Sequence, residues 1–531
     1  MVAPHVNTRN RSCMWPAASK LEIFCSFFRA IPVEMAIHTL VSAILLVVVY
    51  AVGVVVYRLW WHPLASLPGP KLWAISRLPW LWHMVKGDLW RALARLHDEF
   101  GDTIRIAPNE VTTLSTSAWQ EIYTAQPLLL KDTFSQTPPM NGSPSLFTAE
   151  NETHKRIRGI LAFAFSSKAL REQAALIEHH NSRFVARINR ELEQHKILDI
   201  NKFYGYVAFD TITDLSYGES TACLDIPGPH TWIEKFFLHA QYSAVRNSLR
   251  WYSPIDKILD FCFLGITRKT REKNWSVAAA KIDRRLSTRE ARADLLTPVI
   301  GRVSEEENPR KGVTKKEILS NALALVIADC QLTAGALTSC TYFLLKSPGA
   351  LKEVVKEVRS AFQRDGDITV QAVQDLVYLG AVLNETLRIH HPSPISLPRT
   401  MPANSSRVIS GTLIPGNTIV GVSLQNIFHC PKYWHKPDEF HPERFLPPSD
   451  LRYDPMFDSD NRAAFMPFST GPRNCIGAKL FFAQARLALA KLIWNFDIQG
   501  AEPCMDTWPD HRVFIVLEPK PLHVRLTRRE S

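Results

Sequence analysis

A single cysteine in the stretch "FSTGPRNCIG" has the residue types and spacing best suited to chemistry. Cys475 stands between Gly471 and Gly477, with Arg473 two residues before it and Phe468 at the start of the stretch. Glycines permit backbone conformations and close approaches that a Cβ would forbid. An apolar helix is predicted directly afterwards, and the free N–H groups at a helix start favour negative charge. We therefore expect a lowered pKa for the Cys475 thiol and a thiolate in this loop.

A thiolate needs an electrophile or a metal as its partner. No Cys/His signature of a nucleophilic enzyme surrounds Cys475, and none of the nine cysteines forms a C-x-x-C pair, so neither a zinc site nor a disulfide scaffold is indicated. Haem iron suits the loop better, because Phe468 can pack on a flat apolar group and Arg473 can meet an anionic one.

The stretch resembles the haem-ligand signature of the cytochrome P450 family, Phe-x-x-Gly-x-Arg-x-Cys-x-Gly, at each of its defining positions. The resemblance implies haem b with Cys475 as the axial ligand of the iron. Two further motifs stand in the family's order. "LNETLRIHHPSP" contains Glu385 and Arg388 on one helical face, and "PDEFHPERF" supplies Arg444. Together they resemble the family's structural Glu-Arg-Arg cluster, although Glu-x-x-Arg alone is an ordinary surface ion pair.

Three more cations resemble the family's partners for the haem carboxylates. His154 and Arg158, four residues apart in "ENETHKRIRGILAFAFS", match an aromatic-x-x-x-Arg element, and Arg399 in "SLPRTMP" matches a second arginine. Arginine suits this role because its planar fork binds a carboxylate in two places. A solvated basic face is the alternative interpretation of all three residues.

The segment "EILSNALALVIADCQLTAGALTSCTYFLLK" resembles the family's central helix, but it departs from the usual Ala-Gly-x-(Asp/Glu)-Thr-Thr. The chain reads Ala328-Asp329-Cys330-Gln331-Leu332-Thr333, so the customary acid and alcohol are Gln331 and Leu332. Leu332 cannot relay protons. We expect a Gln331–water–Thr333 relay in place of the usual pair. The alternative is that Thr333 simply bonds the preceding turn.

Substrate contacts are expected by position in the family. The loop "LLLKDTFSQTPPMNGSPSLF" would cover the haem, and the aromatic stretch from residue 232 to 265 would form a lid that touches the membrane. The predicted pocket wall, which suits a lipophilic molecule, consists of Ala328, Leu332, Ile395, Ser396 and Leu397.

The N-terminal region predicts how this site is held in the cell. Residues 35–57 form 23 positions without a charge, which is enough for a helix to cross a bilayer. The segment 58–70 follows with two tryptophans, three prolines and a glycine, and it predicts a hinge. Residues 1–34 carry basic residues that compete in setting orientation, and we interpret them as an extension that is not native. The anchor would then be single-pass, in the endoplasmic reticulum membrane, with a cytosolic catalytic domain.

The remaining chain, residues 71–531, is predicted to be one large domain, mainly α with small β-sheets, as in the cytochrome P450 fold. Amphipathic helical patterns dominate to about residue 390, and short runs such as 101–115 and 407–424 predict small hairpins. The net charge of +11 comes without a basic cluster or nucleic-acid motif, so a nucleic-acid partner is not expected. It suits an acidic protein partner instead.

The resemblance implies a membrane-anchored haem-thiolate monooxygenase of the fungal secondary-metabolism type. It would hydroxylate or epoxidise a lipophilic small molecule, with electrons from NADPH delivered by cytochrome P450 reductase and with cytochrome b5 as a second candidate donor. Two alternatives stay open. One is a family member that catalyses rearrangement, desaturation or oxidative coupling without net oxygen insertion. The other is a non-catalytic haem sensor or carrier.

Overall fold

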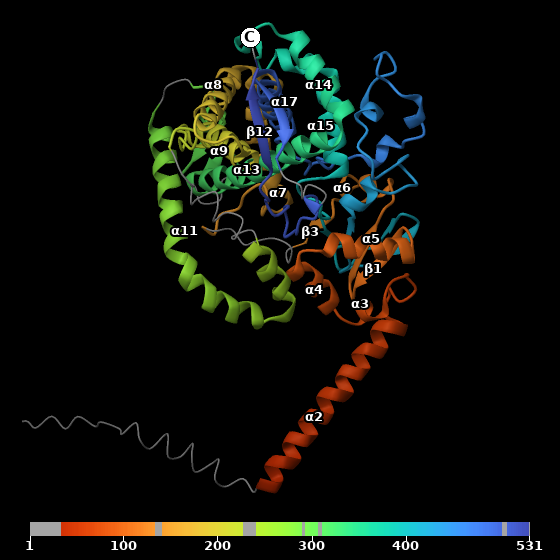
Figure 1. Ribbon diagram of the computed structural model, residues 1–531. Coiled ribbons are helices and arrows are strands. Elements are labelled where there is room, and N and C mark those ends of the chain that lie inside the picture. Colours follow the sequence, from red (N-terminus) through yellow and green to blue (C-terminus); the bar gives the residue numbers. More distant parts are fainter. Residues whose placement is uncertain are drawn as a thin grey trace, which may run out of the picture. The chain divides into compact units, whose positions relative to one another are not determined.

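The computed structural model describes residues 33–132, 141–226, 241–288, 292–305, 311–501 and 507–529 (Figure 1). The chain divides into two compact units, Met1–Ala65 and Ser66–Ser531. The predicted extension 1–34 therefore lies almost wholly outside the described residues.

The first unit contains one long apolar helix. Helix α2 (Val33–Val56) continues without interruption into the π-helical turn η1 (Tyr57–Trp61), so helical backbone extends four residues beyond the predicted end at Tyr57. Its window Ile37–Trp61 is long and apolar enough to cross a membrane, and none of it is buried. Helix α13 of the second unit passes the same test, but more than half of its window is buried, as in a core helix.

Helices dominate the second unit, which confirms the predicted mainly α fold class. They are α3 (Lys71–Ile75), α4 (Leu78–Lys86), α5 (Leu89–Phe100), α6 (Ala118–Tyr123), α7 (Asn151–Leu161), α8 (Ser167–Leu192), α9 (Ile200–Tyr217), α11 (Ile255–Ser287), α12 (Thr297–Ile300), α13 (Lys315–Lys346), α14 (Pro348–Ala361), α15 (Val377–Ile389), α16 (Leu424–Phe428) and α17 (Ala478–Asn495).

The strands form small sheets. A five-stranded sheet has the order β1 (Thr103–Ala107), β2 (Glu110–Thr113), β10 (Ile419–Val422), β7 (Arg399–Thr400) and β3 (Leu130–Lys131). A three-stranded sheet has the order β11 (Phe496–Gly500), β12 (His523–Arg528) and β4 (Leu198–Asp199). Two-stranded pairs are β5 (Val303–Ser304) with β6 (Val313–Thr314) and β8 (Arg407–Ile409) with β9 (Thr412–Ile414). The predicted hairpins are present as β1–β2 and β8–β9.

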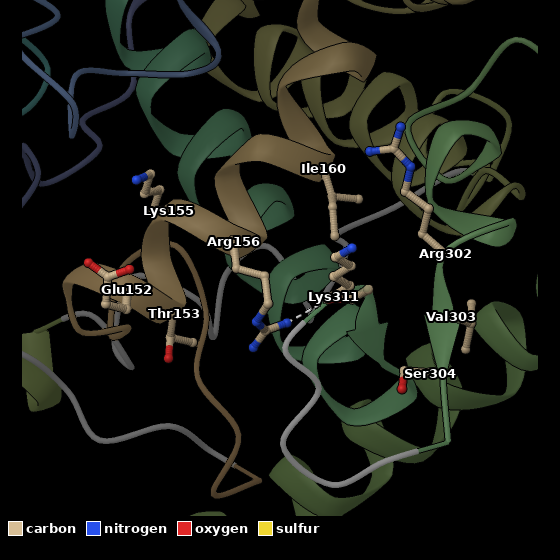
Figure 2. A pocket seen from close by; sticks show the side chains of 10 residues that line it. Glu152, Thr153, Lys155, Arg156, Ile160, Arg302, Val303, Ser304 and Lys311 are labelled. Carbon is tan, nitrogen blue, oxygen red and sulfur yellow. Dashed lines mark hydrogen bonds between the residues drawn. The ribbon is translucent and has the colours of Figure 1, made fainter.

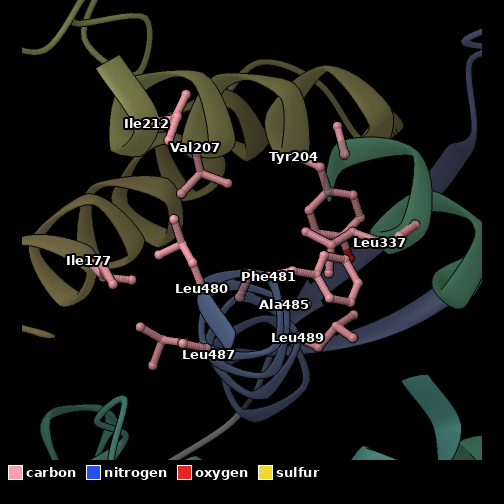
Figure 3. Packing of buried hydrophobic residues seen from close by; sticks show 14 of the residues in the cluster. Ile177, Tyr204, Val207, Ile212, Leu337, Leu480, Phe481, Ala485, Leu487 and Leu489 are labelled. Carbon is pink, nitrogen blue, oxygen red and sulfur yellow. The ribbon is translucent and has the colours of Figure 1, made fainter. Parts of the chain in front are cut away.

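The core lies where α8, α9, α13 and α17 pack together (Figure 3). Helix α13 begins with a capping box, in which the Thr314 side chain accepts from the backbone N–H of Glu317 and the Glu317 carboxylate accepts from that of Thr314. Tyr204 of α9 and Thr341 of α13 join their hydroxyl groups at 2.8 Å. The apolar side chains of this core in Figure 3 are those of Ile177, Val207, Ile212, Leu337, Leu480, Phe481, Ala485, Leu487 and Leu489. This packing fixes α17, and with it the loop that ends in Cys475, against α13.

Candidate active site

The loop that carries Cys475 is closed by its own backbone. The N–H of Cys475 donates to the carbonyl of Phe468 at 2.9 Å, and that of Asn474 donates to Gly471 at 3.1 Å. Gly471 has φ +77°, and a Cβ there would lie 2.2 Å from the carbonyl oxygen of Tyr123, so only glycine fits. Gly477 has φ −87° and is the N-cap of α17. A Cβ on Gly477 would make only ordinary contact with the Cys475 Sγ, at 3.9 Å.

The expected lowering of the Cys475 pKa is wrong for the protein alone. Burial by the surrounding chain raises the thiol pKa, and this effect exceeds the opposing ones from the backbone N–H groups of Gly477 and Ala478 and from the Arg158 guanidinium. The side chain nevertheless keeps exposed surface. Because the thiolate is the form that binds a metal, a metal ion at this accessible sulfur would displace the thiol proton.

Two arginines join this loop to α7. Arg158 donates to the carbonyl and to the side-chain oxygen of Asn474, at 2.7 and 2.5 Å. Arg473 donates through Nη2 to the carbonyl of Ala149 and to Asn151 Oδ1, both at 2.9 Å. The other terminal nitrogen of Arg473, Nη1, is buried without a hydrogen-bond partner. A buried charged donor that lacks a partner is costly, so it indicates a missing acceptor.

A cluster of cations gathers beside the loop. Burial and the charges of Arg473, Lys131, Arg158 and Arg399, in that order, lower the pKa of His154 to about 3. Burial, Arg473 and Arg399 lower that of Lys131 to about 7. Burial and Arg399 lower that of Arg473 to about 10. No described carboxylate forms an ion pair with any member of this cation cluster, so an anionic group is the partner that these side chains lack.

Lys131 was not found from the sequence, which predicted only His154, Arg158, Arg399 and Arg473 in this role. It stands in strand β3, directly opposite Arg399 in strand β7. Among the described residues, its Nζ donates to the backbone carbonyls of Leu146 and Phe147 and forms no ion pair. A lysine between apolar residues and an aspartate gives no motif to recognise, and the β3–β7 register alone brings it to the cluster.

On α13, Thr333 bonds to the preceding turn, through the side chain of Asp329. Thr333 is buried, and its hydroxyl donates to Oδ1 of Asp329 one turn earlier, at 3.3 Å. Within the described residues no hydrogen bond joins Thr333 to Gln331, which is half-buried. Gln484 of α17 donates from Nε2 to both oxygens of Asp329 at 3.3 Å. The structure thus brings together Asp329, Thr333 and Gln484, whereas the sequence, in which Asp329 stands where the family has a glycine, predicted no place for Asp329 in the site.

The predicted pocket wall is partly open in the structure. Ala328, Leu332, Ile395 and Ser396 are half-buried and Leu397 is exposed, so each could still contact a bound molecule. The middle of the expected covering loop, residues 133–140, and the first part of the expected lid, up to residue 240, lie outside the described residues.

The Glu385 cluster is fully buried and charge-balanced. Arg388 donates to both oxygens of Glu385, at 2.7 and 2.8 Å, and Arg444 donates to Oε1 at 3.1 Å. Arg444 also forms an ion pair with Asp460, and the backbone N–H of His441 donates to Glu385 at 2.9 Å. The surface-pair alternative therefore does not apply.

A mainly helical domain with an accessible cysteine beside cations that lack a described carboxylate partner is suited to hold an anionic group that contains a metal. The family model "Cytochrome P450" matches residues 67–526, and the chain belongs to this family, in its fungal secondary-metabolism group. It is similar to the cytochrome P450 monooxygenase astA of Talaromyces wortmannii, with 34% identity over 91% of this chain and 96% of the relative. It is also similar to the averantin hydroxylase of Dothistroma septosporum, with 35% identity over 95% of this chain and 94% of the relative.

Proposed function

We propose that this protein is a membrane-anchored haem-thiolate monooxygenase that hydroxylates or epoxidises a lipophilic small molecule in a secondary-metabolite pathway. The observation that carries the proposal is the cation cluster, which lacks any described carboxylate partner and lies beside the Cys475 loop. The resemblance to fungal monooxygenases, among them two averantin hydroxylases, supports the reaction class and the pathway type.

The residues present fit haem b. Cys475 would bind the iron through its sulfur, and the half-buried Phe468, whose ring lies 5.5 Å from that of Phe482, would pack beside the haem. The two carboxylates of haem would be bound by the cation cluster, which consists of Arg158, Arg399, Arg473, His154 and Lys131. One of them would supply the acceptor that Nη1 of Arg473 lacks. When bound, the haem supplies the activation of dioxygen, and the thiolate tunes its electronic properties.

The chain's own residues then have separate tasks. The cation cluster orients the cofactor and neutralises its charge, whereas the Glu385 cluster, with Arg388 and Arg444, only stabilises the surrounding fold. Thr333, together with Gln331 through a water, is the proposed source of protons on the α13 side.

Replacing Lys131 with methionine is expected to weaken haem retention by about 1.5–3 kcal/mol, which is roughly ten- to a hundredfold in the dissociation rate. Methionine keeps the apolar stem but removes the charge that would pair with a haem carboxylate. Without haem the same change should stabilise the protein, because it relieves the repulsion from Arg473 and Arg399. Transfer of haem to an excess of a haem-free globin measures the dissociation rate.

The matched control is Lys479→Met, which removes an exposed lysine of α17 whose one hydrogen bond within the described residues is to Ser167. It should leave the haem dissociation rate unchanged. Equal dissociation rates for the Lys131 variant and the wild type would remove Lys131 from the haem site.

An NADPH–cytochrome P450 reductase is the proposed electron donor, with cytochrome b5 as a second partner. Helix α7 supports this proposal because it turns one side towards the cysteine loop, through Arg158, and another towards an open pocket. Lys155, Arg156, Arg302 and Lys311 line that pocket, and Glu152 is the acidic side chain among the described residues that line it (Figure 2). Arg156 is already paired with Glu317, so the other three cations offer the charge that an acidic partner would meet.

The proposed location is the endoplasmic reticulum membrane, with residues 35–57 as a single anchor, 58–70 as a hinge and the catalytic domain, 71–531, in the cytosol. Residues 1–34 would be dispensable.

Within the second unit, Leu78, Trp82 and Val85 are exposed on one face of α4, at four- and three-residue spacing. The hydroxyl of Ser76, just before α4, lies 3.3 Å from that of Tyr252, just before α11. This apolar surface supports contact with lipid near the predicted lid.

Isotope-labelled dioxygen tests the proposed reaction. The full-length protein in lipid bilayers, supplied with reductase, NADPH and extracts of cells that express the gene, should yield a product that contains one oxygen atom from the label, detected by mass spectrometry. Product formation without label would instead support rearrangement, desaturation or coupling, the alternative that the missing acid and alcohol on α13 favour. The sensor or carrier alternative has no such support, since the relatives are monooxygenases.

A further inference from the structure

Helix α13 has one carboxyl group in the region where the family's acid and alcohol are missing. Its acidic residues are Glu317, which forms the N-terminal cap, and Asp329. Asp329 is half-buried, and one turn later the buried Thr333 donates its hydroxyl to Oδ1 of the carboxyl. The Nε2 group of Gln484, on α17, lies 3.3 Å from both carboxyl oxygens. The carboxyl thus links the proposed proton donor Thr333 to α17, the helix that follows Cys475.

The surroundings of Asp329 shift the pKa of its carboxyl group towards neutral pH. Burial raises its pKa to about 7, and the hydrogen bonds from Gln484 and Thr333 act in the opposite direction. No cation contributes. The negative charge of Asp329 raises the pKa of two thiols, those of Cys330 on α13 and Cys475 before α17. Its partner on α17, Gln484, carries no charge. A negative charge at Cys475 would favour the protonated carboxyl further.

The protonation of a carboxyl group decides which partner must donate. An ionised carboxylate only accepts, so the Thr333 proton is committed to Asp329. A protonated carboxyl can donate to the Thr333 oxygen, and the Thr333 proton then becomes available to a second acceptor. The threonine hydroxyl does not titrate near neutral pH, so the carboxyl group determines which of these two states is present.

We propose that Asp329 is the positioning residue of the active site: through its own proton it decides whether the Thr333 hydroxyl donates back along α13 or into the active site. This inference rests on the proposed function of Thr333. It adds to the proposed Gln331 water a side chain that contacts Thr333 directly.

Infrared spectroscopy of the resting, haem-loaded protein tests the geometry without any turnover. The wild type should show a C=O band of a protonated carboxyl that disappears as the pH rises through about 7, and Asp329→Asn should lack it. Thr333→Val should raise the midpoint by about one pH unit, because a hydrogen bond to the charged form is lost. Thr333→Ser keeps the hydroxyl and should retain the wild-type midpoint. A band that persists in Asp329→Asn with the same midpoint would overturn the assignment.

The functional consequence is read from the share of consumed dioxygen that is released as hydrogen peroxide, with reductase and NADPH and without added substrate. In the wild type and in Thr333→Ser this share should rise with pH through about 7. In Asp329→Asn it should not depend on pH, and in Thr333→Val it should be high at every pH. A wild-type pH profile in Asp329→Asn overturns the proposal. A missing thiolate–haem spectrum with carbon monoxide would contradict the proposed function instead, while the infrared titration could still be read.

Discussion

Serine at position 475 is expected to abolish turnover and the optical signature of the thiolate–haem complex with carbon monoxide. Serine is close to cysteine in size and keeps the loop hydrogen bond to Phe468, so the fold should be unchanged. What is lost is the sulfur. Burial already raises the pKa of the Cys475 thiol in the protein alone, and iron can displace the proton of a thiol far more readily than that of an alcohol. Haem should still bind, because the cation cluster is intact. It should bind more weakly, because the sulfur ligand is lost.

The control for this experiment is Cys430→Ser, which changes a half-buried cysteine outside the loop. It should retain both the spectrum and the turnover, measured by carbon monoxide difference spectroscopy and NADPH-dependent product formation. An unchanged spectrum in Cys475→Ser would mean that another residue binds the iron, and the assignment of the loop would fall.

The local motifs could be predicted from the sequence because each consists of residues close together in the chain. The Cys475 loop closes through its own backbone, and Glu385 and Arg388 are three residues apart on α15. The cation cluster was predicted in four of its five members. Lys131 was missed because its place depends on the pairing of β3 with β7, which joins segments far apart in the sequence.

Burial is the second quantity that sequence reasoning could not supply. The helix start and Arg158 act on the Cys475 thiol in the expected direction, but the surrounding protein outweighs them and raises the pKa. Burial likewise raises the pKa of Asp329. Its hydrogen-bond partner Gln484 reaches it only because α17 packs on α13. Charge and spacing can be read along a chain, whereas desolvation depends on the finished fold.

Glu385→Gln is expected to destabilise the protein by about 3–5 kcal/mol. This is a large part of the free energy of unfolding of a folded protein, which is usually about 5–15 kcal/mol. Glutamine keeps the volume and one acceptor oxygen, but it leaves Arg388 and Arg444 buried with only Asp460 to balance them. Both arginines are also held by backbone carbonyls, so they cannot move to solvent. We expect a lower unfolding midpoint in urea, and a large fraction of the purified protein without haem.

The matched control is Asp367→Asn, because Arg364 and Asp367 are also an ion pair at three-residue spacing but are exposed to solvent. Removing that charge should cost no more than about 1 kcal/mol, since water solvates the remaining arginine. The spacing of the two pairs is the same, so the difference between the two variants reports the burial of the Glu385 cluster together with its additional partners Arg444 and His441. If both variants unfold at the same urea concentration, the Glu385 cluster adds no more to the stability of this fold than a surface pair does.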